Sequence, residues 1–500
     1  MKNLIIVVEA ILYLTGASSL EELDEETLCR FERLESLPVL INYCSRNSLK
    51  ESGLVSAYQA ASLIEYRERT GAILSETELG LIDGFTPETA RALMPFISLE
   101  SESTPGLNTK KHSRSELTMN GGFRKSDGTG ESASVRYSYD NRICSVNAGF
   151  KYNGKADGSV CATFSGRKAI RLVVLGDYNL SYGQGACLWS GFTLNGVPTV
   201  DAIYRKPSGI SRSVSSSRGN KYRGLAASFA TGRFTEDIFY SYKELAGGNI
   251  GFSGKSFNMD LTAYKGSKGW GLGLSGRGTL HKTDIFGEAA YTADGLNIIA
   301  GAVWNIAYKV KCGGRVSRGK DGYALAAGAQ YKYYSLTVEY RNEFLKIILS
   351  GRQPLTSEKA AVQSVLELKA SARKQEAWKT EIRIDSRNTW NGLELNARAD
   401  ILWNKSVASL GYIEAGYRRD RLYAYLRGTL FLIDSWDDRI YVYERDVPSS
   451  FNVPAYHGRG WNASIVLRWK NLYLRAATTQ YPSGSKKPKA ELKIQYKLVW

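Results

Sequence analysis

The chain is poor in the residues that build metal and catalytic centres. It has three histidines and six cysteines among 500 residues, and no two cysteines stand in a Cys-x-x-Cys spacing. The ligand spacings of structural zinc sites are therefore absent, and we expect neither a metal nor a cofactor. In an oxidising compartment, Cys29 could pair with Cys44 or Cys144 with Cys161; the alternative is that the cysteines fill small buried positions.

Long apolar runs are also missing. No stretch reaches the roughly 18 uncharged apolar residues that a membrane-spanning helix needs, which excludes a helical membrane protein. The mean hydropathy of -0.29 does not exclude a β-barrel, because barrel strands alternate between apolar and polar residues. Proline (11) is scarce, whereas glycine (49) and tyrosine (31) are abundant. This mixture is typical of many strands with small residues facing a lumen and aromatic residues at membrane interfaces.

The net charge of +17 is unevenly distributed along the chain. Residues 1–104 carry 8 Lys/Arg and 17 Asp/Glu, a net charge of −9, so the remaining residues carry +26. Such a split predicts different partners for an acidic head and a strongly basic body.

The body, residues 115–500, consists of short alternating segments separated by Asn-Gly and Asp-Gly turn signals. The last segment, Lys489–Trp500, places Tyr496, Leu498 and Trp500 on one apolar face. A final strand that ends in an aromatic residue resembles the assembly signal of Gram-negative outer-membrane β-barrels. The resemblance implies the outer membrane, contact with lipopolysaccharide and recognition by the barrel-assembly machinery. With ~9–11 residues per strand, we expect roughly 20–24 antiparallel strands.

The first 19 residues indicate a secretory signal peptide, which places the next domain in the periplasm. Lys2 precedes an apolar run from Leu4 to Leu14, and the small residues 16–19 offer a cleavage site. Glu9, inside the apolar run, departs from the usual pattern.

Residues 20–100 are predicted to be helical, and a polar linker, residues 101–114, follows them. The string Gln59-Ala60-x-x-Leu63-Ile64-x-Tyr66-Arg67 and two hairpins 31 residues apart resemble a tandem helix-hairpin-helix module of the competence-protein (ComEA-like) type. The hairpin turns are Gly53-Leu54-Val55 and Gly84-Phe85-Thr86. The expected fold is thus α+β multidomain: a small all-α domain followed by a large transmembrane β-barrel.

The helix-hairpin-helix resemblance implies DNA binding, in which backbone N–H groups of the turn reach a phosphate. Here Val55 and Thr86 stand where the family has a second glycine, and the domain around them is acidic, which opposes phosphate binding. We therefore favour a docking or gating domain with a periplasmic protein partner. DNA binding is the alternative, with Arg67, Arg69 and Arg91 as the phosphate contacts.

Two segments, residues 175–189 and 434–460, interrupt the alternation and resemble segments of large Bacteroidota barrel proteins that carry an N-terminal helix-hairpin-helix module. They are predicted to form a lumenal constriction or binding site; the alternative is a polar network that braces an infolded loop. His457 near Asp446 or Ser449 is the one available catalytic pairing, and we predict that the protein is not an enzyme. The lumenal candidates are Asp177, Gln184, Glu444, Arg445, Asp446 and His457.

Residues 205–223 form a basic segment that contains no acidic residue. It is either an exposed loop that meets lipopolysaccharide phosphates or a guide for an anionic polymer through the pore. Its basic residues are Arg205, Lys206, Arg212, Arg218, Lys221 and Arg223.

Three functions remain open from the sequence. The first is a pore or an export or uptake channel for an anionic or polymeric substrate, with the helical domain as a dock or gate. The second is a DNA-uptake receptor. The third is a non-conducting barrel that scaffolds an envelope or secretion complex.

Overall fold

The structure is a computed structural model. It describes residues 4–44, 49, 52–100, 113–126, 128–141, 143–166, 169–215, 221–254, 257–307, 309–320, 322–356, 362–375, 377–419, 422–448, 450–482 and 486–500.

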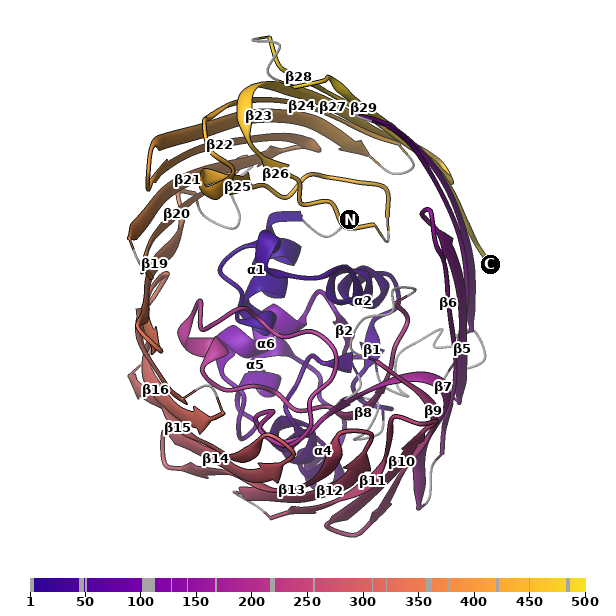
Figure 1. Ribbon diagram of the computed structural model, residues 1–500. Helices are drawn as coiled ribbons and strands as arrows, with labels where there is room; N and C mark the ends of the chain where they lie inside the picture. Colours follow the sequence, from indigo (N-terminus) through magenta and orange to yellow (C-terminus); the bar gives the residue numbers. More distant parts are fainter. Residues whose placement is uncertain are drawn as a thin grey trace.

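In this part of the chain, 24 antiparallel strands close into a barrel (Figure 1), which confirms the predicted fold class. The strands pair in chain order from β3 to β24 and then through β27, β28 and β29, and the short strand β8 is an additional partner of β7. The first strands are β3 (Arg114–Lys125), β4 (Thr129–Asp140), β5 (Cys144–Tyr152), β6 (Ala156–Ser165), β7 (Ile170–Ser181), β8 (Gly209–Arg212), β9 (Tyr222–Thr231), β10 (Phe234–Ser241), β11 (Leu245–Ser253), β12 (Phe257–Gly266), β13 (Gly269–Leu280) and β14 (Thr283–Thr292). The remaining strands are β15 (Gly295–Ala307), β16 (Val310–Gly319), β17 (Gly322–Tyr331), β18 (Tyr334–Arg341), β19 (Phe344–Pro354), β20 (Val362–Lys374), β21 (Trp378–Trp390), β22 (Leu393–Trp403), β23 (Val407–Arg419), β24 (Leu422–Ile433), β27 (Gly458–Trp469), β28 (Leu472–Gln480) and β29 (Lys489–Val499).

The final strand closes the ring. β29 pairs with β3 from Ala490↔Lys125 to Val499↔Glu116, and the backbones of Trp500 and Ser115 exchange two further hydrogen bonds of 2.8 and 3.0 Å. Closure leaves no strand edge, as a hydrocarbon environment requires. Tyr496, Leu498 and Trp500 lie on the outer surface, as their shared face predicts.

Alternation along each strand separates an apolar outer surface from a polar lumen. On β24, the Leu426 and Leu430 side chains are 60% and 69% exposed outside, whereas Arg427 and Thr429 are buried inside. Large apolar side chains are exposed in the same alternating way on most other strands. An outer surface of this kind is stable only against lipid, because water would penalise so much exposed apolar area.

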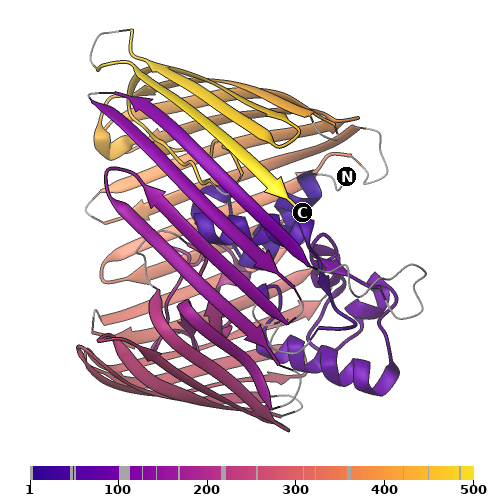
Figure 2. The same ribbon diagram turned by 90° about the vertical axis from the view of Figure 1, so that its right-hand side faces the viewer.

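The acidic head folds into helices that lie largely within the barrel (Figure 1). Part of it projects from the barrel end at which β29 finishes (Figure 2). Asp24, Ser56 and Thr86 each cap a helix N-terminus with the side chain, which explains where these helices begin. The head elements are α1 (Leu4–Thr15), η1 (Leu20–Glu22), α2 (Glu25–Ser36), β1 (Val39–Leu40), α4 (Ala57–Thr70), α5 (Glu76–Gly80), α6 (Pro87–Leu93) and β2 (Ile97–Ser98).

One apolar core holds the head together. Phe31 of α2 contacts Phe96 with ring centroids 4.9 Å apart, and Leu63, Leu79 and Leu93 are buried in the same cluster. β1 and β2 pair in parallel and join the segment after α2 to the end of the domain. The described helices include none that is both long and apolar enough to cross a membrane.

The predicted signal peptide is part of this core. Its apolar run forms α1, which packs against α6, and Leu12 and Leu14 are buried there. Cleavage of residues 1–19 stays a prediction, and it would remove α1 from the apolar core of the head. The six cysteines are free thiols, so neither predicted pairing is formed.

Two segments between strands fold back into the lumen. Residues 182–208, between β7 and β8, contain η3 (Val200–Ala202), which packs on Phe286 and Ala326 of the wall. Residues 434–457, between β24 and β27, contain η4 (Trp436–Asp438), β25 (Ile440–Tyr441) and β26 (Ala455–Tyr456). We call these the first and second infolded segments. Together with the head they occupy the lumen (Figure 1).

Candidate functional site

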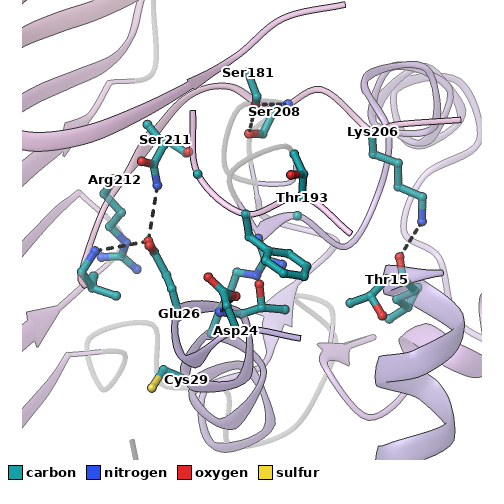
Figure 3. Close-up of a pocket in the computed structure, with 18 of the residues that line it drawn as sticks. Thr15, Asp24, Glu26, Cys29, Ser181, Thr193, Lys206, Ser208, Ser211 and Arg212 are labelled. Carbon is teal, nitrogen blue, oxygen red and sulfur yellow. Dashed lines mark hydrogen bonds between the residues drawn. The ribbon is translucent and has the colours of Figure 1, made fainter. Parts of the chain in front are cut away.

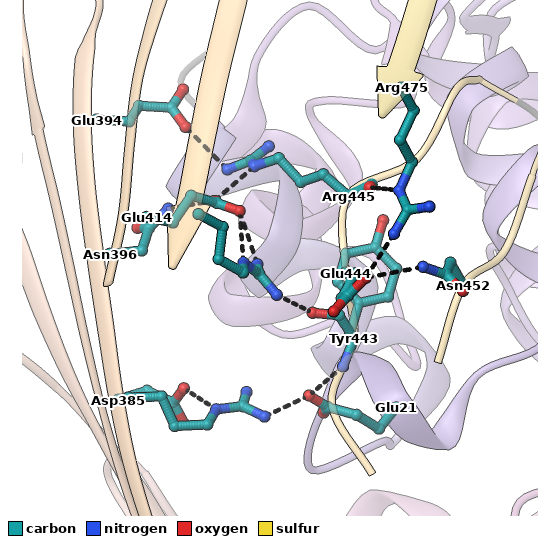
Figure 4. A network of polar contacts seen from close by, with 12 residues as sticks. Glu21, Asp385, Glu394, Asn396, Glu414, Tyr443, Glu444, Arg445, Asn452 and Arg475 are labelled. Carbon is teal, nitrogen blue, oxygen red and sulfur yellow. Dashed lines mark hydrogen bonds and ion pairs between the residues drawn. The ribbon is translucent and has the colours of Figure 1, made fainter. Parts of the chain in front are cut away.

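The head meets the barrel wall through carboxylates at its start. Arg398 of β22 donates to Glu21 at 2.7 Å and Arg383 of β21 lies at 3.4 Å, while the backbone N–H of Tyr443 donates at 3.1 Å. Glu21 thus joins the head, the wall and the second infolded segment (Figure 4). Lys369 of β20 donates to the neighbouring Glu22 at 2.9 Å.

The ion pairs keep these two carboxylates charged in a buried place. Burial alone would raise the pKa of Glu21, but the charges of Arg398 and Arg383 hold that pKa well below its usual value. Burial also opposes ionisation of Glu22, and Lys369 nevertheless holds its pKa below the usual value. Both carboxylates therefore depend on their basic partners in the wall.

Helix α2 continues this contact along the opposite wall. Arg33 lies 3.4 Å from Asp140 of β4, and Arg136 lies 3.7 Å from Glu25. Glu26 accepts from the backbone N–H of Val214 at 3.4 Å, and burial and the nearby charge of Asp24 raise its pKa. In contrast to Glu21 and Glu22, Glu26 is therefore harder to ionise than an ordinary glutamate.

The acidic residues at the start of the head thus have two roles: some stabilise the N-terminus of helix α2, and others pair with bases of the barrel wall. Glu25 and Glu26 do lie in the first turn of α2, where acids are favourable. Glu21 and Glu22 precede it and pair with lumenal bases. A head of net charge −9 is fitted into a body of net charge +26.

The second infolded segment is braced by a network of buried ions (Figure 4). Arg475 of β28 donates to Glu444 at 2.5 Å, and Tyr456 donates to the same carboxylate. Arg445 donates to Glu414 at 2.7 Å and to Glu394 at 3.0 Å. The predicted lumenal residues Glu444 and Arg445 do face inward, and their contacts are those of the bracing alternative.

Asp446 belongs to the same network and is not free to act with His457. Lys493 donates to it at 2.5 Å and Ser450 at 3.0 Å. His457 instead stands edge-on to Trp436, with ring centroids 4.5 Å apart. Ser449, the other predicted partner of this histidine, lies outside the described residues.

The first infolded segment is held by Gln184 and Glu288. Glu288 of β14 accepts three backbone N–H groups, those of Gln184, Ala186 and Cys187, at 2.5 to 3.0 Å. The Gln184 side chain accepts from the backbone N–H of Arg205 and donates to its carbonyl, at 2.9 and 3.1 Å. The sequence singled out Gln184 but gave no signal for Glu288, which is one acid in an otherwise ordinary strand.

The basic segment is not the exposed loop that one sequence hypothesis described. Arg205 and Lys206 turn into the lumen, and Arg212 donates to Asp140 at 2.6 Å. Lys221 and Arg223 both donate to buried Asp177, at 3.1 and 2.6 Å. The hypothesis is wrong for Arg205, Lys206, Arg212 and Lys221, because buried partners hold them inside; Arg223 keeps an exposed side chain, and Arg218 lies outside the described residues.

The chain turns at both predicted positions in the head, while the helix-hairpin-helix assignment stays a prediction. Gly53 and Gly84 take φ angles of +68° and +81°, which glycine adopts without strain. Gln59, from the capping box of α4, donates to the Gly84 carbonyl at 2.8 Å and so joins the hairpins. Leu54, Val55 and Phe85 are buried, and Thr86 caps α6.

The first hairpin faces the barrel and not open solvent. Arg277 of β13 donates to Ser56 at 3.0 Å. Arg67 donates to the carbonyls of Ile41 and Cys44, at 2.8 and 3.0 Å, so it is used inside the head. Arg91 lies 3.6 Å from Glu76, and Arg69 is exposed. Of the predicted phosphate contacts, Arg67 is therefore engaged within the head, whereas Arg69 and Arg91 keep exposed side chains.

Two cavities border the head. One, of about 730 Å³, lies between α1, α6 and the wall of β17–β21. The other, of about 280 Å³, lies between α2, the first infolded segment and the wall (Figure 3). In the residues that the structure describes, no cluster of His, Cys, Asp and Glu could hold a metal ion.

No known family matches this chain, and no curated protein does so. Solved structures similar to it include Acinetobacter baumannii OccAB4, with 8% identity, a TM-score of 0.33, and coverage of 79% of this chain and 100% of that one. Pseudomonas aeruginosa OccK11 has 10% identity, a TM-score of 0.32, and coverage of 78% and 96%. Pseudomonas aeruginosa OccK2 in complex with glucuronate has 8% identity, a TM-score of 0.33, and coverage of 78% and 98%.

With similarities this low, the class of this protein follows from its own geometry. A closed ring of 24 strands with an apolar outer surface and a charged lumen defines a transmembrane β-barrel protein. Its lumen is occupied by the chain's own head and by two infolded segments.

Proposed function

We propose that the protein is an outer-membrane channel that its own acidic head closes. The observation that carries the proposal is the fit of the head's carboxylates to lumenal bases, above all Glu21 to Arg398 and Arg383. A barrel of this width cannot be filled by wall side chains alone. The head supplies the missing volume, and its removal or tilting would open a path.

The substrate of such a channel is a small anion or an anionic polymer. A displaced head would leave Lys369 without Glu22, and it would leave Arg383 and Arg398 with Asp385 of the wall but without Glu21. An anion entering the lumen would then take the place of the head's carboxylates, so that permeation and gating use the same bases. Opening and anion preference are therefore expected together.

The part of the head outside the barrel is suited to a periplasmic protein partner. Leu74 and Leu81 are 67% and 80% exposed, and the acidic side chains of Glu65 and Glu68 on α4 are exposed as well. A partner with a basic rim and an apolar centre would fit such a surface. The competence-type and Bacteroidota resemblances stay predictions from the sequence, and DNA uptake is disfavoured by the acidic charge and by the engaged Arg67.

Single-channel recording of the full chain tests the proposal. We expect rare openings for the native protein and frequent, anion-selective openings for the double variant Glu21→Gln, Glu22→Gln. The matched double variant Glu65→Gln, Glu68→Gln removes the same charge from the exposed face of α4 and should behave like the native protein. Silence of all three proteins would favour the scaffold function, and cation-selective openings would contradict an anionic substrate.

A further inference from the structure

The cavity behind α2 has an excess of positive charge. It has a volume of about 280 Å³ and is bordered by α2, the first infolded segment and the wall (Figure 3). Nine basic and six acidic side chains line it. Its volume falls just below the range of about 300–1,000 Å³ that is usual for sites of drug-sized ligands, so it suits a smaller molecule.

The six carboxylates of the lining are all engaged by other groups. Asp140 forms ion pairs with Arg33 and Arg212, and Asp201 forms one with Lys311 at 3.2 Å. Glu116 pairs with Arg114 and Lys497, and Asp24 caps α2. Glu26 accepts hydrogen bonds from Val214, Ser213 and Asn179. Glu32 also has a partner. The acids of the lining are thus committed elsewhere.

Four bases of the lining have no carboxylate within ion-pair distance among the described residues. They come from three parts of the fold: Arg30 from α2, Arg205 and Lys206 from the first infolded segment, and Arg315 from β16. Lys206 donates only to the carbonyl of Leu14, at 2.9 Å, and Figure 3 shows it extended towards the end of α1. The Nε atom of Arg30 is buried without a hydrogen-bond partner.

Arg205 is held in place without being neutralised. It donates to the carbonyl of Gln184 at 3.1 Å and lies over the ring of Trp189 at 5.6 Å. Burial, together with the charge of Arg315, lowers the pKa of Arg205 to about 10, and burial lowers the pKa of Lys206 to about 8. These bases have lost much of their hydration without a carboxylate at ion-pair distance, which destabilises their charged forms. The more distant charges of Glu288 and Asp201 raise the pKa values of Arg205 and Lys206 but do not outweigh burial.

We propose that this cavity binds a small oxyanion with two or more negative charges, such as a sulfate, a phosphate or a polycarboxylate. The guanidinium groups of Arg30, Arg205 and Arg315 offer forked donors that match such oxygens, and Lys206 adds a point charge. Because the four bases belong to three separate elements, the bound anion would fasten the head and the first infolded segment to the wall. The site does not depend on whether the barrel conducts.

Binding to the full chain in detergent tests the site. Isothermal titration with sulfate and with citrate, at constant ionic strength set by chloride, should show saturable binding with a stoichiometry of one. The variant Arg205→Gln, Arg315→Gln should bind at least tenfold more weakly. Lys346→Met is the matched control: Lys346 is a lumenal base of β19 that does not line this cavity, and its loss should leave the affinity unchanged.

The outcomes separate a built site from general attraction to a basic lumen. Absence of saturable binding by either anion would overturn the proposal. Equal loss of affinity in the double variant and in Lys346→Met would do so too, because the effect would then come from overall charge. Heat-modifiable gel mobility shows that each variant barrel is folded, and channel recordings, which test the proposed function, leave this result unaffected.

Discussion

Glu21 of the head and Arg398 of β22 form a 2.7 Å ion pair across 377 positions of sequence, with side chains only 9% and 3% exposed. Arg398 also donates to Asp385 at 2.5 Å, so a carboxylate of the wall holds it as well. Tyr443 adds its backbone N–H to the same carboxylate. Head, wall and second infolded segment are therefore coupled through one side chain.

Replacement of Glu21 by Gln should release the head. The substitution leaves Arg398 and Arg383 buried with one negative charge fewer, and loss of one partner of a buried pair costs about 3–5 kcal/mol. We expect faster cleavage of the head by an added protease and more frequent channel openings. Both are measured on the intact barrel in lipid.

The control for this prediction is Glu68→Gln, a change of the same type on the exposed face of α4. It should leave cleavage and openings at native levels. Native protection of the head in Glu21→Gln would show that the ion pair does not hold the head in place.

Acid should loosen the head. The pKa values of Glu21 and Glu22 are lowered, by Arg398 and by Lys369 respectively, against the effect of burial. Their stabilisation is complete above the ordinary value of 4.5 and is lost as the pH falls from there through their lowered pKa values. Glu26, with its raised pKa, has the opposite and partly offsetting trend.

Protease protection of the head, measured between pH 3 and pH 7 with an acid-tolerant protease, checks this dependence. We expect protection to fall below about pH 4.5 in the native protein, with a shallower decline in Glu21→Gln. Constant protection across this range would contradict the role given to the two carboxylates.

Arg475→Met should free the second infolded segment without opening the ring. Arg475 is buried and lies against Glu444, Asp446 and Glu491. Its removal leaves two buried carboxylates, Glu444 and Asp446, short of positive charge, at a cost of about 3–5 kcal/mol. The segment should become accessible to protease, while the barrel keeps its heat-modifiable mobility.

Arg459→Gln is the matched change for Arg475→Met. Arg459 pairs with Asp434 at 2.6 Å, but both side chains are largely exposed, so loss of this pair should change the stability of the segment little. A segment that is equally protected in both variants would show that apolar packing, not the ion network, holds it inside.

Local patterns predicted the barrel well. Alternation of the kind seen around Leu426 and Arg427 assigns inner and outer faces without knowledge of the partners, and the length of the body gave a range of strands that includes the observed 24. The turns at Gly53 and Gly84 could also be predicted from the sequence, because the backbone conformation of a glycine turn depends on only a few neighbouring residues.

The interior was not predictable in the same way. Acidic residues at the start of a helix are accounted for locally by the helix dipole. Only the partners in β20, β21 and β22, far along the chain, show that Glu21 and Glu22 contact the wall. Likewise, Arg205 and Lys206 look like part of an exposed basic loop until Gln184 and Leu14 are seen to hold them inside. Contacts between residues so far apart in the sequence form only when the barrel closes, so local sequence patterns do not predict them.

The affinity of the cavity for sulfate should fall as the pH rises through about 8, the lowered pKa of Lys206. Burial lowers this pKa, Asp201 raises it, and the charges of Lys311, Arg277 and Arg30 lower it further. Sulfate stays a dianion across this range, so the change in affinity reports the protein alone. A bound dianion favours protonated Lys206, and linkage then requires weaker binding once the amine is neutral.

Titration of sulfate at pH 7, 8 and 9 measures this effect, and Lys206→Arg supplies the control. Arginine stays protonated throughout, so this variant should bind sulfate with an affinity that changes little between pH 7 and 9. Lys206→Met should bind more weakly and also without pH dependence. If native protein and Lys206→Arg lose affinity in parallel, another group titrates, and Lys206 does not contact the anion.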